Sequence, residues 1–320
     1  MDNSGYLLAR EMTTRVGQPL IYLILLLSIA LAVAAAVPVL RRNLRYLVLA
    51  VFLNLVMGWL LLANFHYRIA TDLVLIDPNL GTVAGRFYIP VWIEDEKFFF
   101  WTLILAGLVL FSRYKDRAWQ TALSMLLAIF GILTFFTSNP FAEPLKDFHA
   151  AYTQYAATAV ANVEPAVKAQ AYFPLYGKMV GFYNSEYMWT HPPLLFISYA
   201  TFAVAFVGGI LMLTRRDDVY EKLGYAYAKA GFIILTVGML LGYPWALMAW
   251  SGEPWWYDPK INITLMMWVA YSAYLHSRLY IHRQGMRMTT AVLNYLGFFG
   301  VIFTYVSTYL IPGIHAVAGG

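Results

Sequence analysis

Three of the six histidines in this chain stand at the ends of hydrophobic runs, where an imidazole could serve as a metal ligand. His191 opens one run in THPPLLF, His315 follows another in LIPGIHAV, and His66 follows a third. The sequence has no cysteine, which excludes thiolate ligands, and it places no cluster of carboxylates beside His191 or His315. Two imidazoles without such partners favour haem iron over zinc. The alternative is that each is an ordinary solvated histidine.

The residues around His191 predict how its imidazole would be held. Pro192 and Pro193 suit the first turn of a helix, where a missing N–H group costs nothing. Thr190 or His191 would then cap that helix. The positive end of the helix disfavours imidazolium, so the neutral ring that a metal requires would be present.

A short aromatic loop provides a second candidate feature. Residues 250–260 read WSGEPWWYDPK, so that Trp250, Trp255, Trp256 and Tyr257 precede Asp258 and a proline. Indole faces can cover the apolar surface of a flat macrocycle and exclude water from it. Trp and Tyr also commonly anchor membrane proteins at the lipid–water boundary, and this interpretation stays open.

His276 lies deeper, about fifteen residues beyond that loop, which corresponds to roughly 22 Å along a helix. A histidine within a membrane span is a functional candidate because lipid offers its nitrogens no partners. It could instead form a hydrogen bond to a neighbouring helix. We expect His149 and His282 to be ordinary surface residues.

Composition indicates the elements that position these residues. Hydrophobic residues make up 61% of the 320 residues and charged residues only 12%, so much apolar surface must face lipid. The sequence therefore predicts an all-α polytopic membrane helix bundle, with residues 1–320 forming a single integral membrane domain. Gly231, Gly238 and Gly242 suit close contacts between helices. Eight runs are long enough to span: 18–40, 44–64, 98–112, 118–137, 192–213, 226–248, 261–282 and 289–311.

The distribution of Lys and Arg predicts the orientation. Basic clusters such as Arg41–Arg42 and Arg215–Arg216 fall in alternate connections, which should be cytoplasmic. The loops 65–97, 138–190 and 249–260 and both termini would then lie on the extracytoplasmic side of the inner or plasma membrane. We expect lipid and protein partners and no nucleic acid.

Several stretches in order carry a resemblance to a known family. They are TSNPF (137–141), THPPLLFISYATFAVAF (190–206), GYPWALMAWSGEPWWYDPK (242–260), WVAYSAYLHSR (268–278) and LIPGIHAV (310–317). The chain resembles the CcmF/CcsA family of haem-handling proteins in cytochrome c maturation, which is marked by a tryptophan-rich WWD-type loop. Tyr257 stands where the family usually has a tryptophan, and the glutamate that normally follows the Asp-Pro pair is missing.

The resemblance implies roles for the candidate residues. His191 and His315 match the outer histidines that ligate the haem b to be attached. His276 matches a ligand of a second, membrane-buried b-type haem. The aromatic residues and the acid of the loop match a haem platform: Trp250, Trp255, Trp256, Tyr257 and Asp258.

The function implied by the resemblance is that of a haem-handling component of a cytochrome c synthase. It would hold haem on the outer face for thioether formation with the Cys-x-x-Cys-His segment of an apocytochrome c, as part of a haem lyase. A second membrane subunit, such as a CcsB-like protein, would assist. Two alternatives stay open: a CcmC-type haem exporter or chaperone without ligation, and a respiratory b-type membrane cytochrome. The latter requires a second buried histidine near His276.

Overall fold

The computed structural model describes residues 3–112, 116–161, 163–250 and 254–313, and these residues are mostly helical. The chain divides into two compact units. The first comprises Met1–Leu110 with Met125–Trp189, and the second comprises Phe111–Ser124 with Thr190–Gly320. The single integral membrane domain expected over residues 1–320 stays a prediction.

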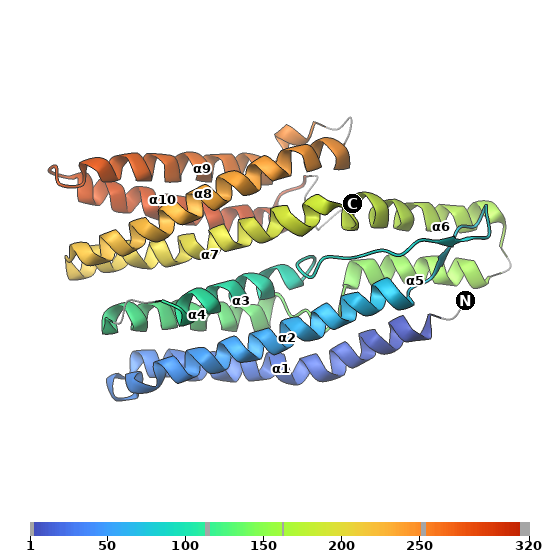
Figure 1. Cartoon of the computed structure of the whole chain (residues 1–320), viewed down its shortest axis with the longest axis horizontal. Helices are drawn as coiled ribbons and strands as arrows, with labels where there is room; N and C mark the ends of the chain where they lie inside the picture. Colours follow the sequence, from blue (N-terminus) through green and yellow to red (C-terminus); the bar gives the residue numbers. More distant parts are fainter. Residues whose placement is uncertain (1–2, 113–115, 162, 251–253, 314–320) are drawn as a thin grey trace. The chain divides into compact units, whose positions relative to one another are not determined.

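The first unit is built on long apolar helices. α1 (Ser4–Ala36) packs against α2 (Leu44–Asp72), and α2 packs against α3 (Glu96–Leu110), as Figure 1 shows. A short 3-10 helix, η1 (Pro38–Asn43), joins α1 to α2. α4 (Arg117–Thr137) contributes residues to both units. These four helices coincide with four of the predicted spans. The spans were predicted because their apolar runs exceed what a soluble core needs.

The segments 73–95 and 138–185 form the rest of the first unit. The former carries a two-residue antiparallel pair, β1 (Leu75–Ile76) and β2 (Val83–Ala84). The latter, expected as a long outer loop, contains α5 (Lys146–Val160), α6 (Pro165–Gly177) and a π-helical turn, η2 (Lys178–Tyr183). The two segments pack together: the Tyr155 hydroxyl contacts both backbone polar groups of Ile76, at 2.7 Å to the nitrogen and 3.2 Å to the oxygen.

The second unit is a group of helices with the aromatic loop at one end. It contains α7 (Glu186–Arg215) from Thr190 onwards, α8 (Asp218–Ala249), α9 (Pro259–Ser277) and α10 (Met286–Leu310), with the 3-10 turns η3 (Trp255–Tyr257) and η4 (Arg278–Tyr280). α9 packs along α10 and also contacts α8 (Figure 1). The predicted close contacts at glycines are confirmed, since a Cβ atom on Gly231 would lie 2.3 Å from Thr201 Oγ1.

The helices confirm the all-α multipass membrane protein expected from the sequence. All eight predicted runs are helical, but within the described residues six helices are both long and apolar enough to cross a membrane. α3 has 15 residues and is roughly 22 Å long, less than the ~30 Å hydrocarbon core. α9 has 19 residues and carries polar side chains such as Asn262 and Ser272. Six of the eight expected spans thus meet both criteria, and the other two correspond to α3 and α9.

Candidate functional site

A cavity of about 540 Å³ lies in the second unit, between α7, α8, α9 and the aromatic loop. Four of the predicted site residues line it: His191, Trp250, Trp255 and Trp256. Its wall also contains residues that were not predicted from the sequence, including Trp245, Trp268 and Lys260. Gly238, Gly242 and Trp245 recur at helical spacing along one face of α8, a signal that could have identified this wall from the sequence.

His191 lies within α7 and does not cap it, so the predicted capping arrangement was wrong. The helix begins at Glu186 and contains Pro192 and Pro193 inside its second turn. Pro192 has no N–H to offer the carbonyl of Met188 four residues earlier. The indole N–H of Trp92 donates to that carbonyl at 2.8 Å, which lets the helix start earlier than expected. His191 therefore lies beyond the first turn, to which the effect of the positive helix end is largely confined.

A backbone hydrogen bond holds the imidazole of His191 instead. Its Nδ1 donates to the carbonyl of Gly238 at 2.7 Å, because a carbonyl oxygen only accepts. In the neutral ring Nε2 is then the unprotonated nitrogen. Gly242, one turn further along α8, leaves room for the ring, since a Cβ atom there would lie 2.6 Å from Cε1 of His191. The two glycines thus set the position and the tautomer of the imidazole.

Indole rings surround this imidazole. Trp245 stacks beside His191 with ring centroids 6.1 Å apart and planes 28° apart. Trp250 packs edge-on against Trp245 at 4.6 Å, and both indoles are nearly buried, at 8% and 5% exposed respectively. Trp256 and Tyr257 are 54% and 75% exposed. The loop is therefore not uniform: Trp250 belongs to the cavity wall, whereas Tyr257 faces outwards.

Asp258 has a structural role that the sequence analysis did not predict. Its carboxylate accepts the backbone N–H groups of Lys260 at 3.0 Å and Ile261 at 3.3 Å and so caps α9. The side chain is 4% exposed. A Cβ atom on Gly313 would lie 2.7 Å from its other oxygen, so the end of the described chain packs against this cap. His315, two residues later in the sequence, lies outside the described residues.

His276 is placed differently from His191. It occupies the last turn of α9 and is exposed within its unit. Its Nδ1 donates to the carbonyl of Ser272 in the same helix at 2.8 Å, which again leaves Nε2 as the unprotonated nitrogen of the neutral ring. His276 does not line the cavity around His191.

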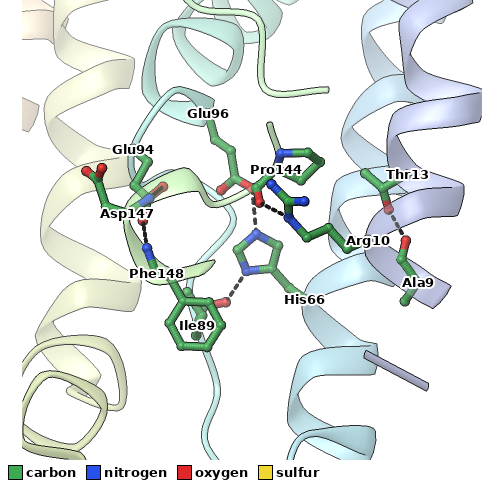
Figure 2. A network of polar contacts seen from close by, with 10 residues as sticks. All are labelled: Ala9, Arg10, Thr13, His66, Ile89, Glu94, Glu96, Pro144, Asp147 and Phe148. Carbon is green, nitrogen blue, oxygen red and sulfur yellow. Dashed lines mark hydrogen bonds and ion pairs between the residues drawn. The ribbon is translucent and has the colours of Figure 1, made fainter. Parts of the chain in front are cut away.

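His66 in the first unit is buried, and Figure 2 shows its contacts with Ile89 and Glu96. α2 continues to Asp72, so His66 lies inside the helix and not after its end as expected. Its Nδ1 donates to the Ile89 carbonyl at 2.7 Å, and its Nε2 is 2.6 Å from Oε1 of Glu96. The side chains of His66 and Glu96 are 4% and 2% exposed. Oε2 of Glu96 is buried without a hydrogen-bond partner among the described residues.

Glu94, close to that pair in Figure 2, ties two segments together. Its carboxylate oxygens accept the backbone N–H groups of Asp147 and Phe148, each at 3.1 Å. It therefore caps α5, whose own capping position holds Leu145, a side chain that cannot accept. Burial raises the pKa of Glu94 to about 7, against the opposing effect of the two N–H groups.

His149 in α5 was expected to be a plain surface residue, and it has a specific partner instead. Its Nδ1 lies 2.9 Å from the hydroxyl of Tyr6. Burial, with a smaller contribution from Arg10, lowers the pKa of this imidazole. Among the described residues no three His, Asp or Glu side chains gather as the ligands of a bare metal ion.

Known proteins are similar to much of this chain. The family of the cytochrome C assembly protein matches residues 92–315. The chain is 27% identical over 211 residues to the cytochrome c-type biogenesis protein CcmF of Escherichia coli, covering 59% of this chain and 28% of that protein. It is 41% identical over 97 residues to the cytochrome c biogenesis protein CcsA of Prochlorococcus marinus, covering 30% of each chain.

A solved structure shares the fold. The cytochrome c haem lyase CcmF has a TM-score of 0.60 to this chain at 16% identity, over 92% of this chain and 46% of that one. The chain therefore spans less than half the length of each of these three relatives.

Proposed function

Because this chain belongs to the cytochrome C assembly protein family, we propose that it binds haem b in the His191 cavity and presents it to an apocytochrome c. The main support for this proposal is the hydrogen bond that holds the imidazole of His191. The Gly238 carbonyl directs the proton to Nδ1, which leaves Nε2 as the ligating nitrogen of the neutral ring. Such a bond to the other ring nitrogen is the usual support of a metal-ligating histidine.

The cavity also fits the group. Its volume of about 540 Å³ lies in the usual range of small-molecule sites. Trp245 and Trp250 provide flat apolar walls that exclude water, as a porphyrin requires. We propose that His315 would hold the haem iron together with His191. Supporting this, Gly313 packs against Asp258 at the end of the aromatic loop, two residues before His315.

The reaction proposed for the complete assembly is thioether formation. Haem b supplies two vinyl groups when it is bound. Each thiol of the Cys-x-x-Cys-His segment adds across one vinyl group: the S–H bond and the C=C π bond break, and one C–S bond and one C–H bond form. The addition needs no oxidant. This chain contributes placement, because it would fix the iron through His191 and hold the group still for the incoming thiols.

We also propose that both termini, the aromatic loop and the haem site lie on the outer side of the inner or plasma membrane. The basic clusters in alternate connections support this orientation. We also propose that His276 ligates a second, buried b-type haem together with a histidine of another membrane subunit. Its exposure within the unit supports a partner on that side of α9.

Haem content of the purified protein tests the proposal. His191→Ala should remove most of the bound haem seen in the visible spectrum and by pyridine extraction, whereas His282→Ala, at an exposed histidine, should not. Trp250→Ala should lower haem content, while Tyr257→Ala, 75% exposed, should leave it unchanged. Normal haem content in His191→Ala would exclude this site.

Expression in a host that lacks its own haem ligase tests whether the chain takes part in covalent attachment of haem to an apocytochrome c. With the necessary partner subunits supplied, covalent cytochrome c should form with the wild-type chain and not with His191→Ala. Haem binding without any covalent product would support the exporter or chaperone alternative instead.

A further inference from the structure

A further cavity, of about 470 Å³, lies in the first unit near the beginning of α1. Charged and apolar side chains of α1 and of residues 142–149 line it, including Leu7, Arg10, Glu11, Arg15, Glu143 and His149. Glu143 already pairs with Lys146 at 3.2 Å. The cavity thus combines both signs of charge, unlike the largely apolar cavity around His191.

The two arginines of this cavity are not neutralised by acids of the protein. The Nε–H of Arg10 donates to the Pro144 carbonyl at 3.0 Å (Figure 2), which holds the guanidinium in the cavity wall and leaves its terminal NH₂ groups for another partner. In the part of the chain that the structure describes, no ion pair engages Arg10, Glu11 or Arg15. Two guanidinium groups and one carboxylate are therefore open to a ligand.

The cavity lies at the level where α1 enters the hydrocarbon core. α1 has 33 residues and is roughly 50 Å long, which exceeds the ~30 Å core. Arg15 is roughly 30 Å along the helix from Ala36, its last residue, and the basic residues Arg41 and Arg42 follow that end. Arg15 therefore lies at the opposite boundary of the hydrocarbon core, level with the lipid headgroups.

An apolar stripe continues from the cavity along the same face of α1. Tyr22 follows Arg15 by seven residues, and Leu26 and Ile29 come four and then three residues later, which is the spacing of one helix face. All three side chains are exposed, as lipid-facing side chains are. A phosphate held at Arg15 would thus lie directly above a surface suited to acyl chains.

We propose that this cavity binds the headgroup of a zwitterionic phospholipid with a primary ammonium, as in phosphatidylethanolamine. The guanidinium groups of Arg10 and Arg15 would donate to the phosphate, whose geometry they match, and the ammonium would donate to Glu11. A phosphate alone would leave the Glu11 carboxylate unpaired beside it. Charged pockets between membrane helices are suited to lipid headgroups. This site is separate from the haem proposal, since it uses none of the residues around His191.

Native mass spectrometry of the full chain, purified in a neutral detergent and stripped of lipid, tests the proposal. Phosphatidylethanolamine, phosphatidylcholine and phosphatidylglycerol with identical acyl chains are added in equal amounts, and the bound lipid is identified by its mass. The wild-type protein should retain phosphatidylethanolamine about tenfold more than either of the others, as expected for a charge-assisted hydrogen bond. The quaternary amine of phosphatidylcholine has no N–H group for Glu11, and phosphatidylglycerol has no amine.

Variants of the two exposed ligands locate the site. Arg15→Gln should lower the amount of bound phosphatidylethanolamine about tenfold, because it removes a charged donor to the phosphate. Glu11→Gln should still bind lipid but lose the preference over phosphatidylcholine. Arg42→Gln, at an exposed arginine beyond the other end of α1, is the matched control and should retain lipid as the wild type does. Haem content should stay unchanged in all three variants.

Three results would overturn the proposal. They are equal retention of the three lipids by the wild-type protein, wild-type retention by Arg15→Gln, and displacement of the lipid by inorganic phosphate, which would assign the cavity to a free anion. Arg15 and Glu11 are exposed, and the wild-type comparison needs no variant, so a failure to fold does not obscure the result. None of these results concerns haem content, so a failure of this inference is distinguishable from a failure of the proposed function.

Discussion

His66 and His191 form the same kind of hydrogen bond through Nδ1, but the other side of each ring has different neighbours. Each donates Nδ1–H to a backbone carbonyl at 2.7 Å, His66 to Ile89 and His191 to Gly238. The Nε2 of His66 then meets the carboxylate of Glu96 at 2.6 Å in a buried site. The ring of His191 stands in the wall of a cavity among indoles.

The difference teaches that burial and hydrogen bonding alone do not mark a ligand-binding histidine. At His66 the second nitrogen is committed to a carboxylate, so the residue joins α2 to the start of α3. At His191 the wall offers space and apolar surface beside the ring. These contacts give His66 a structural role, whereas the binding role proposed for His191 rests on its place in the cavity wall. Variants at the contacts of both residues test this comparison.

The largest effect is expected from breaking the His66 pair. Glu96→Leu removes the partner of Nε2 inside a buried site, which should lower the free energy of unfolding by about 3 kcal/mol. Unfolding in mixed detergent micelles, followed by tryptophan fluorescence, measures it. Glu143→Leu, at a carboxylate whose side chain is 59% exposed, should have almost no effect. A stable Glu96→Leu protein that has lost its haem would contradict the division of roles.

A smaller effect is expected from displacing His191 without changing it. Gly242→Ala introduces a carbon that would lie 2.6 Å from the imidazole, so the ring must move away from the Gly238 carbonyl. Loss of such a supporting bond typically weakens metal binding by about 10- to 100-fold. Titration of haem measures the change. Gly177→Ala in α6, where an added carbon meets nothing within 4 Å, should leave haem affinity unaltered, and unaltered affinity in Gly242→Ala would refute this support.

The smallest effect concerns Glu94, which caps α5 beside the His66 pair. Its pKa is raised to about 7 in the folded protein, so folding favours its protonated form. The stability that Glu94 contributes is therefore fully present below about pH 4.5 and is lost as the pH rises through 7. We expect the wild-type protein to lose about 1–2 kcal/mol relative to Glu94→Gln between pH 5 and pH 8.

The measurement is the unfolding of both proteins across that pH range. Glu143→Gln serves as the control, because its carboxylate is exposed beside Lys146. Parallel curves for the wild-type protein and Glu94→Gln would show that the Glu94 carboxyl does not titrate in this window.

Part of the candidate site could be predicted from the sequence because some of its residues are close together in the chain. His191 at the end of an apolar run and the crowded indoles of the aromatic loop are visible as neighbours in the chain. The cap that Asp258 forms on α9 is also a local feature, because an aspartate before a proline often signals the start of a helix. Trp245 and Lys260 were missed because their approach to His191 depends on how α7, α8 and α9 pack.

The sequence by itself determined that this is a helical membrane protein, since its apolar runs exceed any soluble core. It also determined the close glycine contacts of α8, whose helical spacing places them on one face. Only the tertiary structure decided how each histidine is held and what surrounds its ring. Both His66 and His191 end or interrupt apolar runs, but a carboxylate 30 residues away meets the first, and a glycine carbonyl 47 residues away positions the second. Hydrogen-bond partners so distant in the chain are set by helix packing, which no local pattern records.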